Sequence, residues 1–168
     1  PQRNRIGFDD VILAEEGRYQ YGVVDDYQIW LGEHGYVGKE YLHGMGNNTY
    51  YTRPWHLPGE CHATNWATRE MIRMIKRKDP TRPAFYYISY CHPHPPLVPL
   101  QCYLDMYRDV EIDEPYYGDW IEDDIYPIQM LRQNGAVYSK EDMIAARRAF
   151  YAQCTHIDHQ IRLLIGTL

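Results

Sequence analysis

Residues 85–100 read FYYISYCHPHPPLVPL. Over the first part, 85–91, both alternating sets of positions are largely apolar or aromatic, which is typical of a strand covered on both faces in a parallel sheet. The second part holds two histidines and four prolines. The stretch therefore predicts a buried strand that ends abruptly in a stiff, polar corner, and it places the chain in the α/β class.

Two amphipathic helices are predicted, one before and one after this strand. Residues 64–78 begin at Thr64 as N-cap and carry apolar side chains at helical spacing, namely Ala67, Met71, Met74 and Ile75. Residues 139–168 begin with Ser139 and Asp142 in a capping-box arrangement. Their apolar stripe is Met143, Ala146, Phe150, Cys154, Ile157, Ile161, Leu164 and Leu168. Each stripe is expected to pack on a core.

Weaker signals fill the rest of the chain. Residues 6–14 read as a short strand, and residues 25–34 as a short helix with Asp25 or Asp26 as N-cap and Gly35 just past its end. Residues 35–61 and 93–135 show no period and are predicted to be irregular, with one helical turn near 104–107.

These elements do not complete a sheet. Two candidate strands cannot form a two-sided parallel sheet with protected edges, and the chain stops after a helix, where the next strand of a βαβ unit should begin. We therefore expect residues 1–168 to be a single domain or a piece of one, either cut from a larger sheet or borrowing strands from a partner.

Composition narrows the possible partners. The 168 residues carry a formal net charge of -6, which argues against a general nucleic-acid binder that gains affinity by neutralising phosphates. No apolar run is long enough to span a membrane, and neither a signal peptide nor an initiator Met is present, so an upstream segment is expected to have been removed. The basic run 69–82 is interpreted as a solvated surface. The four cysteines form no C-x-x-C pair and are interpreted as buried free thiols.

Residues 92–96, HPHPP, are called the proline corner below and are the strongest candidate for a functional site. Ligands of open α/β sheets sit beyond the carboxyl ends of the strands, and His92 and His94 follow such an end. Each is followed by proline, which restricts it to extended geometry. A rigidly held imidazole can donate to an anion or protonate a leaving group near neutral pH. Because i and i+2 side chains of an extended segment point the same way, a shared metal is an alternative.

Several stretches of the chain carry a family resemblance. RPAFYYISYCHPHPPLVPLQCYLDMY (82–107) resembles the sulfatase segment, within the alkaline phosphatase superfamily, in which a P-F-F strand ends in a P-H-x-P turn and runs on to Y-x-D-M-Y. The same order of motifs holds for RIGFD (5–9), ATNWATREMIRMIKR (63–77), EPYYGDW (114–120) and RRAFYAQCTHIDHQIRLLIGTL (147–168). The resemblance implies part of an α/β/α sandwich with a mostly parallel sheet, incomplete in this chain.

The resemblance also implies an activity. Sulfatases hydrolyse sulfate esters with a formylglycine nucleophile beside Ca²⁺, and the histidine of P-H-x-P, here His94, contacts a sulfate oxygen and assists the leaving group. His92, beside it, is taken as a second substrate-binding candidate. The expected substrate is a small-molecule or glycan sulfate ester, and a periplasmic or secreted parent protein is compatible with the resemblance.

Essential sulfatase motifs are missing from the chain. None of the cysteines or serines has an arginine four residues on, so no residue matches the nucleophile motif. The acidic pairs Asp9-Asp10, Asp25-Asp26 and Asp123-Asp124 are interpreted as turns or caps, so no metal ligand is assigned and the calcium ligands are expected outside this chain. The isolated polypeptide is predicted to be inactive, although its parent is a hydrolase.

Two other readings stay open. Phosphodiesterases and phosphonate monoester hydrolases of the same superfamily share the scaffold. A noncatalytic module that binds zinc or a partner through His92, His94, His156 and His159 is a reading from another class. In addition, aromatic residues of the irregular segments could stack on a sugar or simply pack the loops; they are Tyr50, Tyr51, Trp55, Tyr116, Tyr117 and Trp120.

Overall fold

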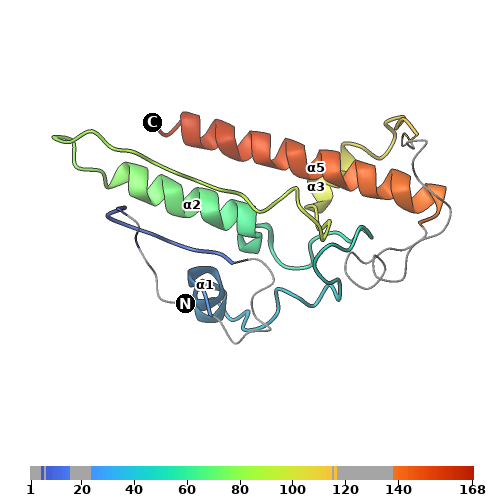
Figure 1. Ribbon diagram of the computed structural model, residues 1–168, viewed down its shortest axis with the longest axis horizontal. Helices are drawn as coiled ribbons and strands as arrows, with labels where there is room; N and C mark the ends of the chain where they lie inside the picture. The colour runs from blue at the N-terminus through green and yellow to red at the C-terminus, as the bar shows by residue number, and fades with distance from the viewer. Residues whose placement is uncertain (1–4, 6, 16–23, 115, 117–137) are drawn as a thin grey trace. The chain divides into compact units, whose positions relative to one another are not determined.

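A computed structural model describes residues 5, 7–15, 24–114, 116 and 138–168 (Figure 1). It contains α1 (Asp26–Glu33), the short 3₁₀ helix η2 (Gly59–Cys61), α2 (Ala63–Lys76), α3 (Gln101–Asp105) and α5 (Lys140–Ile165). The described residues fall into two compact units, the first from 1–44, 55–92 and 157–168, and the second from 45–54 and 93–156. Helices at all three predicted places are confirmed.

In the first unit, α1 and the start of α2 share a core. Asp25 caps α1, because its Oδ1 accepts from the backbone N–H of Gln28 at 2.7 Å, and Gly35 follows the helix with a φ of +83° that favours glycine. Tyr27 and Leu31 are buried with Cys61 and Trp66, and the Tyr27 hydroxyl donates to the Cys61 carbonyl at 2.5 Å. The core therefore satisfies the one polar atom that Tyr27 brings into it.

Glu40 is a buried carboxylate at the edge of this region, with 6% of its surface exposed. Gln28 Nε2 donates to its Oε1 at 2.7 Å, whereas its Oε2 is buried without a hydrogen bond among the described residues. Burial raises the pKa of Glu40 above the ordinary value of 4.5, and the nearby charge of Asp25 adds to the effect.

The α2 helix begins one residue earlier than predicted, and its N-cap is His62 rather than Thr64. Nδ1 of His62 accepts from the backbone N–H of Thr64 at 3.2 Å. Further along, Met71 and Ile75 are buried with Leu164, as the apolar stripe predicted, and Tyr86 and Ile88 pack against them. None of the cysteines is in a disulfide, and only Cys61 is fully buried, so the prediction of buried thiols is wrong for the exposed Cys91 and Cys102.

The segment 85–91 is not covered on both faces in this chain. Tyr86 and Ile88 face the core, but Phe85 is 77% and Tyr87 68% exposed. The described residues contain no strand, and their only ladder pairing is an isolated parallel bridge between Thr52 and Leu97. Residues 7–14, predicted to be part of a strand, also lack strand structure. Without neighbouring strands or covering helices, one face of 85–91 is left open to solvent.

The α5 helix confirms its predicted cap and only part of its predicted packing face. Ser139 Oγ accepts from the backbone N–H of Asp142 at 3.1 Å, and Asp142 accepts in return from the backbone N–H of Ser139 at 3.2 Å. Ala149, Ala152, Gln153, His156, Gln160 and Leu164 are buried, whereas Phe150, Ile161 and Leu168 of the predicted stripe are 42 to 81% exposed. The buried face is thus rotated from the predicted stripe and shares Leu164 with it.

In the second unit, α3 and the residues after it pack on α5. Tyr103 stacks on His156 with ring centroids 4.7 Å apart, and the hydroxyls of Tyr107 and Thr155 are 2.6 Å apart. The predicted helical turn near 104–107 is thus present, three residues earlier. Nowhere in the described part of the chain is a helix both long and apolar enough to cross a bilayer.

Candidate functional site

The proline corner belongs to the second unit from Pro93 onward and is fixed on its C-terminal side. Leu97 and Val98 are 2% and 3% exposed. The Leu97 carbonyl accepts from the backbone N–H of Arg53 at 3.2 Å and from Thr52 Oγ1 at 3.4 Å. Buried apolar side chains and a paired backbone thus anchor the corner only three residues beyond His94.

His94 is exposed, and its ring is oriented by the neighbouring backbone. Nδ1 lies 2.6 Å from the Pro95 carbonyl oxygen. A carbonyl only accepts, so Nδ1 carries the proton in this contact. A neutral ring then has a lone pair at Nε2, and only the imidazolium can donate from Nε2. The corner therefore presents an imidazole whose donor capacity depends on a second proton.

His92 belongs to the first unit and is half-buried against the start of α2. Its Nδ1 lies 3.3 Å from Thr64 Oγ1, and its ring centroid is 4.6 Å from that of the fully buried His62. The sequence did not single out His62 or Thr64 as partners of this histidine. They fix His92 by a hydrogen bond and a ring contact.

The four histidines of the zinc-module reading have separate surroundings. His156 is 1% exposed and stacked on Tyr103, and His94 is exposed. Among the described residues, which include all four of these histidines, no three His, Cys, Asp or Glu side chains come together as a metal site. Of the acidic pairs, Asp25-Asp26 caps α1 as predicted, and Asp123-Asp124 lies outside the described residues.

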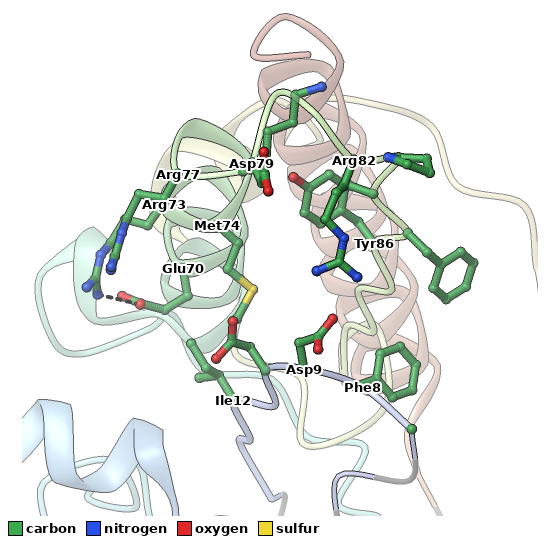
Figure 2. Close-up of a pocket in the computed structure, with 16 residues that line it drawn as sticks. Phe8, Asp9, Ile12, Glu70, Arg73, Met74, Arg77, Asp79, Arg82 and Tyr86 are labelled. Carbon is green, nitrogen blue, oxygen red and sulfur yellow. Dashed lines mark hydrogen bonds and ion pairs between the residues drawn. The ribbon is translucent and has the colours of Figure 1, made fainter.

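A cleft of 770 Å³ lies in the first unit, and neither histidine of the corner lines it (Figure 2). Residues 7–12, the end of α2 and residues 82–86 form its walls. Four acidic and four basic residues line it together with aromatic rings; the charged ones are Asp9, Asp10, Glu70, Asp79, Arg73, Arg77, Lys78 and Arg82. Part of the basic run interpreted as a plain surface thus faces a hollow.

Acidic and basic side chains are equally numerous in the lining of this cleft, so it does not favour either anions or cations. Glu70 accepts from Arg73 at 2.6 Å, and Figure 2 shows the Arg82 side chain on the same side of the cleft mouth as Asp9. Phe8 and Phe85 pack at 6.1 Å between ring centroids at one edge. Asp9-Asp10, predicted to be a turn, contributes carboxylates to the lining, but no charge of one sign dominates.

Three tyrosines of the second unit come together: Tyr50 and Tyr51 on the segment that pairs with the corner, and Tyr138 just before α5. Tyr138 meets the rings of Tyr50 and Tyr51 edge to face, at 6.3 and 5.1 Å between centroids. Tyr50 is 49% and Tyr51 46% exposed. Of the other aromatic candidates, Trp55 packs on His56 and His62, while Tyr117 and Trp120, with most of EPYYGDW, lie outside the described residues.

Comparison with known proteins gives one informative match. No protein-family model matches the chain. Over 181 aligned residues it is 34% identical to the protein named Arylsulfatase of Clostridium perfringens (strain 13 / Type A), and the alignment takes in 99% of this chain but 38% of that protein. The likeness is not confined to one motif, because it extends over nearly the whole chain. It supports the resemblance to sulfatases, and the chain spans well under half the length of this relative.

Proposed function

We propose that this chain is the central part of a sulfatase catalytic domain and that its parent protein hydrolyses sulfate esters. The observation that carries the proposal is the 34% identity to an arylsulfatase along 99% of the chain, together with an exposed, oriented imidazole at His94. The likeness to an arylsulfatase also favours sulfate esters over the phosphodiesters and phosphonates that related enzymes use.

His94 would act on the oxygen atoms around sulfur. Hydrolysis breaks the bond between sulfur and the ester oxygen, and negative charge builds up on the leaving oxygen and the nonbridging oxygens. An imidazolium that already donates Nδ1–H to the Pro95 carbonyl can donate Nε2–H to one of these oxygens. Donors of this kind are typically worth about 2.7 to 4 kcal/mol of transition-state stabilisation. The half-buried His92, fixed by Thr64, is the second candidate for substrate binding.

The nucleophile and the calcium ion implied by the resemblance do not fit this chain. No cysteine or serine has an arginine four residues on, and the described residues hold no cluster of three possible metal ligands. Formylglycine would supply the attack on sulfur and Ca²⁺ would neutralise charge on the sulfate, with both contributed by other parts of the parent. The isolated chain is therefore expected to lack activity.

Exposed apolar side chains support the idea of an excerpt from a larger α/β/α sandwich. In the first unit, Phe85, Tyr87, Ile165 and Leu168 are each at least 67% exposed. Soluble domains seldom leave large apolar side chains of an extended segment and of a helix so open. In the proposed parent, neighbouring strands and helices would cover them.

The test is hydrolysis of p-nitrophenyl sulfate by the full-length protein. We expect activity in the parent, a loss of about 100- to 1,000-fold in kcat for His94→Gln, and little change for His34→Gln. His34 is a matched control because it is also exposed and its Nδ1 also contacts a backbone carbonyl, that of Trp30, at 2.8 Å. Faster turnover of bis-p-nitrophenyl phosphate than of the sulfate would contradict the proposal in favour of a phosphodiesterase.

A further inference from the structure

We infer that Tyr50, Tyr51 and Tyr138 form a subsite that binds a ring in the organic part of the sulfate ester. The inference rests on the proposed function and names residues that would recognise the substrate beyond its sulfate group. It is carried by the pairing of the Tyr50–Thr52 segment with the proline corner and by the exposure of the tyrosine rings.

The first step is the direction of the pairing. The bridge between Thr52 and Leu97 is parallel, so the residues that precede each partner extend to the same side of the bridge. Tyr51 lies one residue before Thr52, and His94 lies three residues before Leu97. The Cα atoms of Tyr51 and His94 are therefore no more than about 20 Å apart, whatever path the chain takes between them. The tyrosines and the candidate catalytic histidine therefore share one region of the second unit.

The second step is the rigidity of the bridge itself. The Leu97 carbonyl accepts both from the Arg53 backbone and from the Thr52 hydroxyl, and Leu97 is 2% exposed. The residues next to a buried pairing that is held by two hydrogen bonds have little freedom to move apart. Tyr51 and the corner are thus held in a fixed relation rather than brought together by a loose loop.

The third step is the state of the rings. Tyr138 makes edge contacts with both Tyr50 and Tyr51, at interplanar angles of 75° and 61°, so the three rings fix one another. About half of the surface of Tyr50 and of Tyr51 is nevertheless exposed. Preordered aromatic rings with open surface bind flat, apolar faces at little entropic cost, and both an aryl group and the apolar face of a pyranose present such a face.

The chemistry of the expected ligand follows from these steps. A sulfate ester held with its sulfate at His94 extends its alcohol portion away from sulfur. A ring in that portion would contact the tyrosine rings, whereas a short alkyl chain would be too small to reach them. The subsite should therefore discriminate between ring-bearing and ringless sulfate esters, with little effect on the chemical step.

The experiment compares three substrates on the full-length protein, namely p-nitrophenyl sulfate, a pyranose 6-sulfate and ethyl sulfate. For Tyr50→Ala and Tyr51→Ala we expect KM of at least one ring-bearing ester to rise about 3- to 10-fold, with kcat and the KM of ethyl sulfate nearly unchanged. Tyr51→Phe should retain the KM of the unsubstituted protein. Tyr116→Ala, at a position 95% exposed, is the matched control. The ester with the larger KM change identifies whether the ring is aryl or pyranose.

Two results would overturn the subsite and are distinct from failure of the proposed function. Unchanged KM values in both alanine variants would show that no ring binds there, and an equal loss on all three substrates with a lowered Tm would show that the tyrosines only pack the fold. By contrast, an unsubstituted full-length protein that hydrolyses none of the three sulfates would overturn the proposed function itself, and the subsite with it.

Discussion

The hydroxyl of Thr64 and Nδ1 of His92 are 3.3 Å apart, so the first turn of α2 holds the first histidine of the proline corner. Thr64 is 2% exposed, and a buried hydrogen bond of this kind contributes about 1 kcal/mol. We expect Thr64→Val, which keeps the shape and removes the hydroxyl, to lower the unfolding free energy by about this amount in urea titrations. Thr64→Ser keeps the hydroxyl and should lose less. If the serine variant is the less stable of the two, packing of the Thr64 methyl group outweighs the hydrogen bond.

Glu40 should make stability depend on pH. Burial raises its pKa in the folded protein, so the folded state holds this proton more tightly than the unfolded chain does. That contribution is fully present below the ordinary pKa of 4.5 and is lost as the pH rises through the raised value. Glu40→Gln removes the ionisation and should therefore raise Tm at pH 8 relative to the unsubstituted protein, with a smaller effect at pH 4. If Glu40→Gln changes Tm by the same amount at pH 4 and at pH 8, Glu40 does not titrate between these two pH values.

The exposed face of 85–91 gives a test of the parent fold. Phe85 is 77% exposed in this chain, and a surface substitution normally changes stability by less than about 0.5 kcal/mol. If a larger sheet covers this face, Phe85→Lys in the full-length protein should cost about 3 kcal/mol or more, because a charge is then placed in a core. Val37→Lys, at a position 76% exposed, is the control in thermal denaturation. Equal, small effects for both would mean that the face stays open in the parent.

The role of His94 predicts a dependence on the leaving group. An alcohol that is a poor leaving group needs a proton more than p-nitrophenolate does. We therefore expect His94→Gln to slow hydrolysis of phenyl sulfate at least about tenfold more than that of p-nitrophenyl sulfate. The measurement is kcat for a series of substituted phenyl sulfates. A uniform loss across the series would assign His94 to binding the sulfate oxygens instead of protonating the leaving group.

Local patterns predicted the helices well. Helical spacing and the capping signals at Asp25 and Ser139 located α1, α2 and α5 to within a few residues. The N-cap of α2 was missed because an imidazole at His62, two residues before Thr64, takes the place of the usual hydroxyl or carboxylate. Such short-range features are encoded within a few residues of where they act.

Burial was harder to predict than helix position. The apolar sides of 85–91 and of residues 139–168 were expected to face a core, yet Phe85 and Leu168 are largely exposed while Gln153 is buried. Which side of an element is covered depends on what packs against it, and the proposed covering elements belong to other parts of the parent. Tyr50 and Tyr51 were named among the aromatic candidates, but their contact with Tyr138 and the cleft were missed, because each joins segments that lie far apart in the sequence.

The cap of α2 has one further consequence. Nδ1 of His62 can accept the Thr64 backbone N–H only while it carries no proton. Because Thr64 in turn holds His92, the start of α2 and the position of His92 both depend on the same imidazole nitrogen.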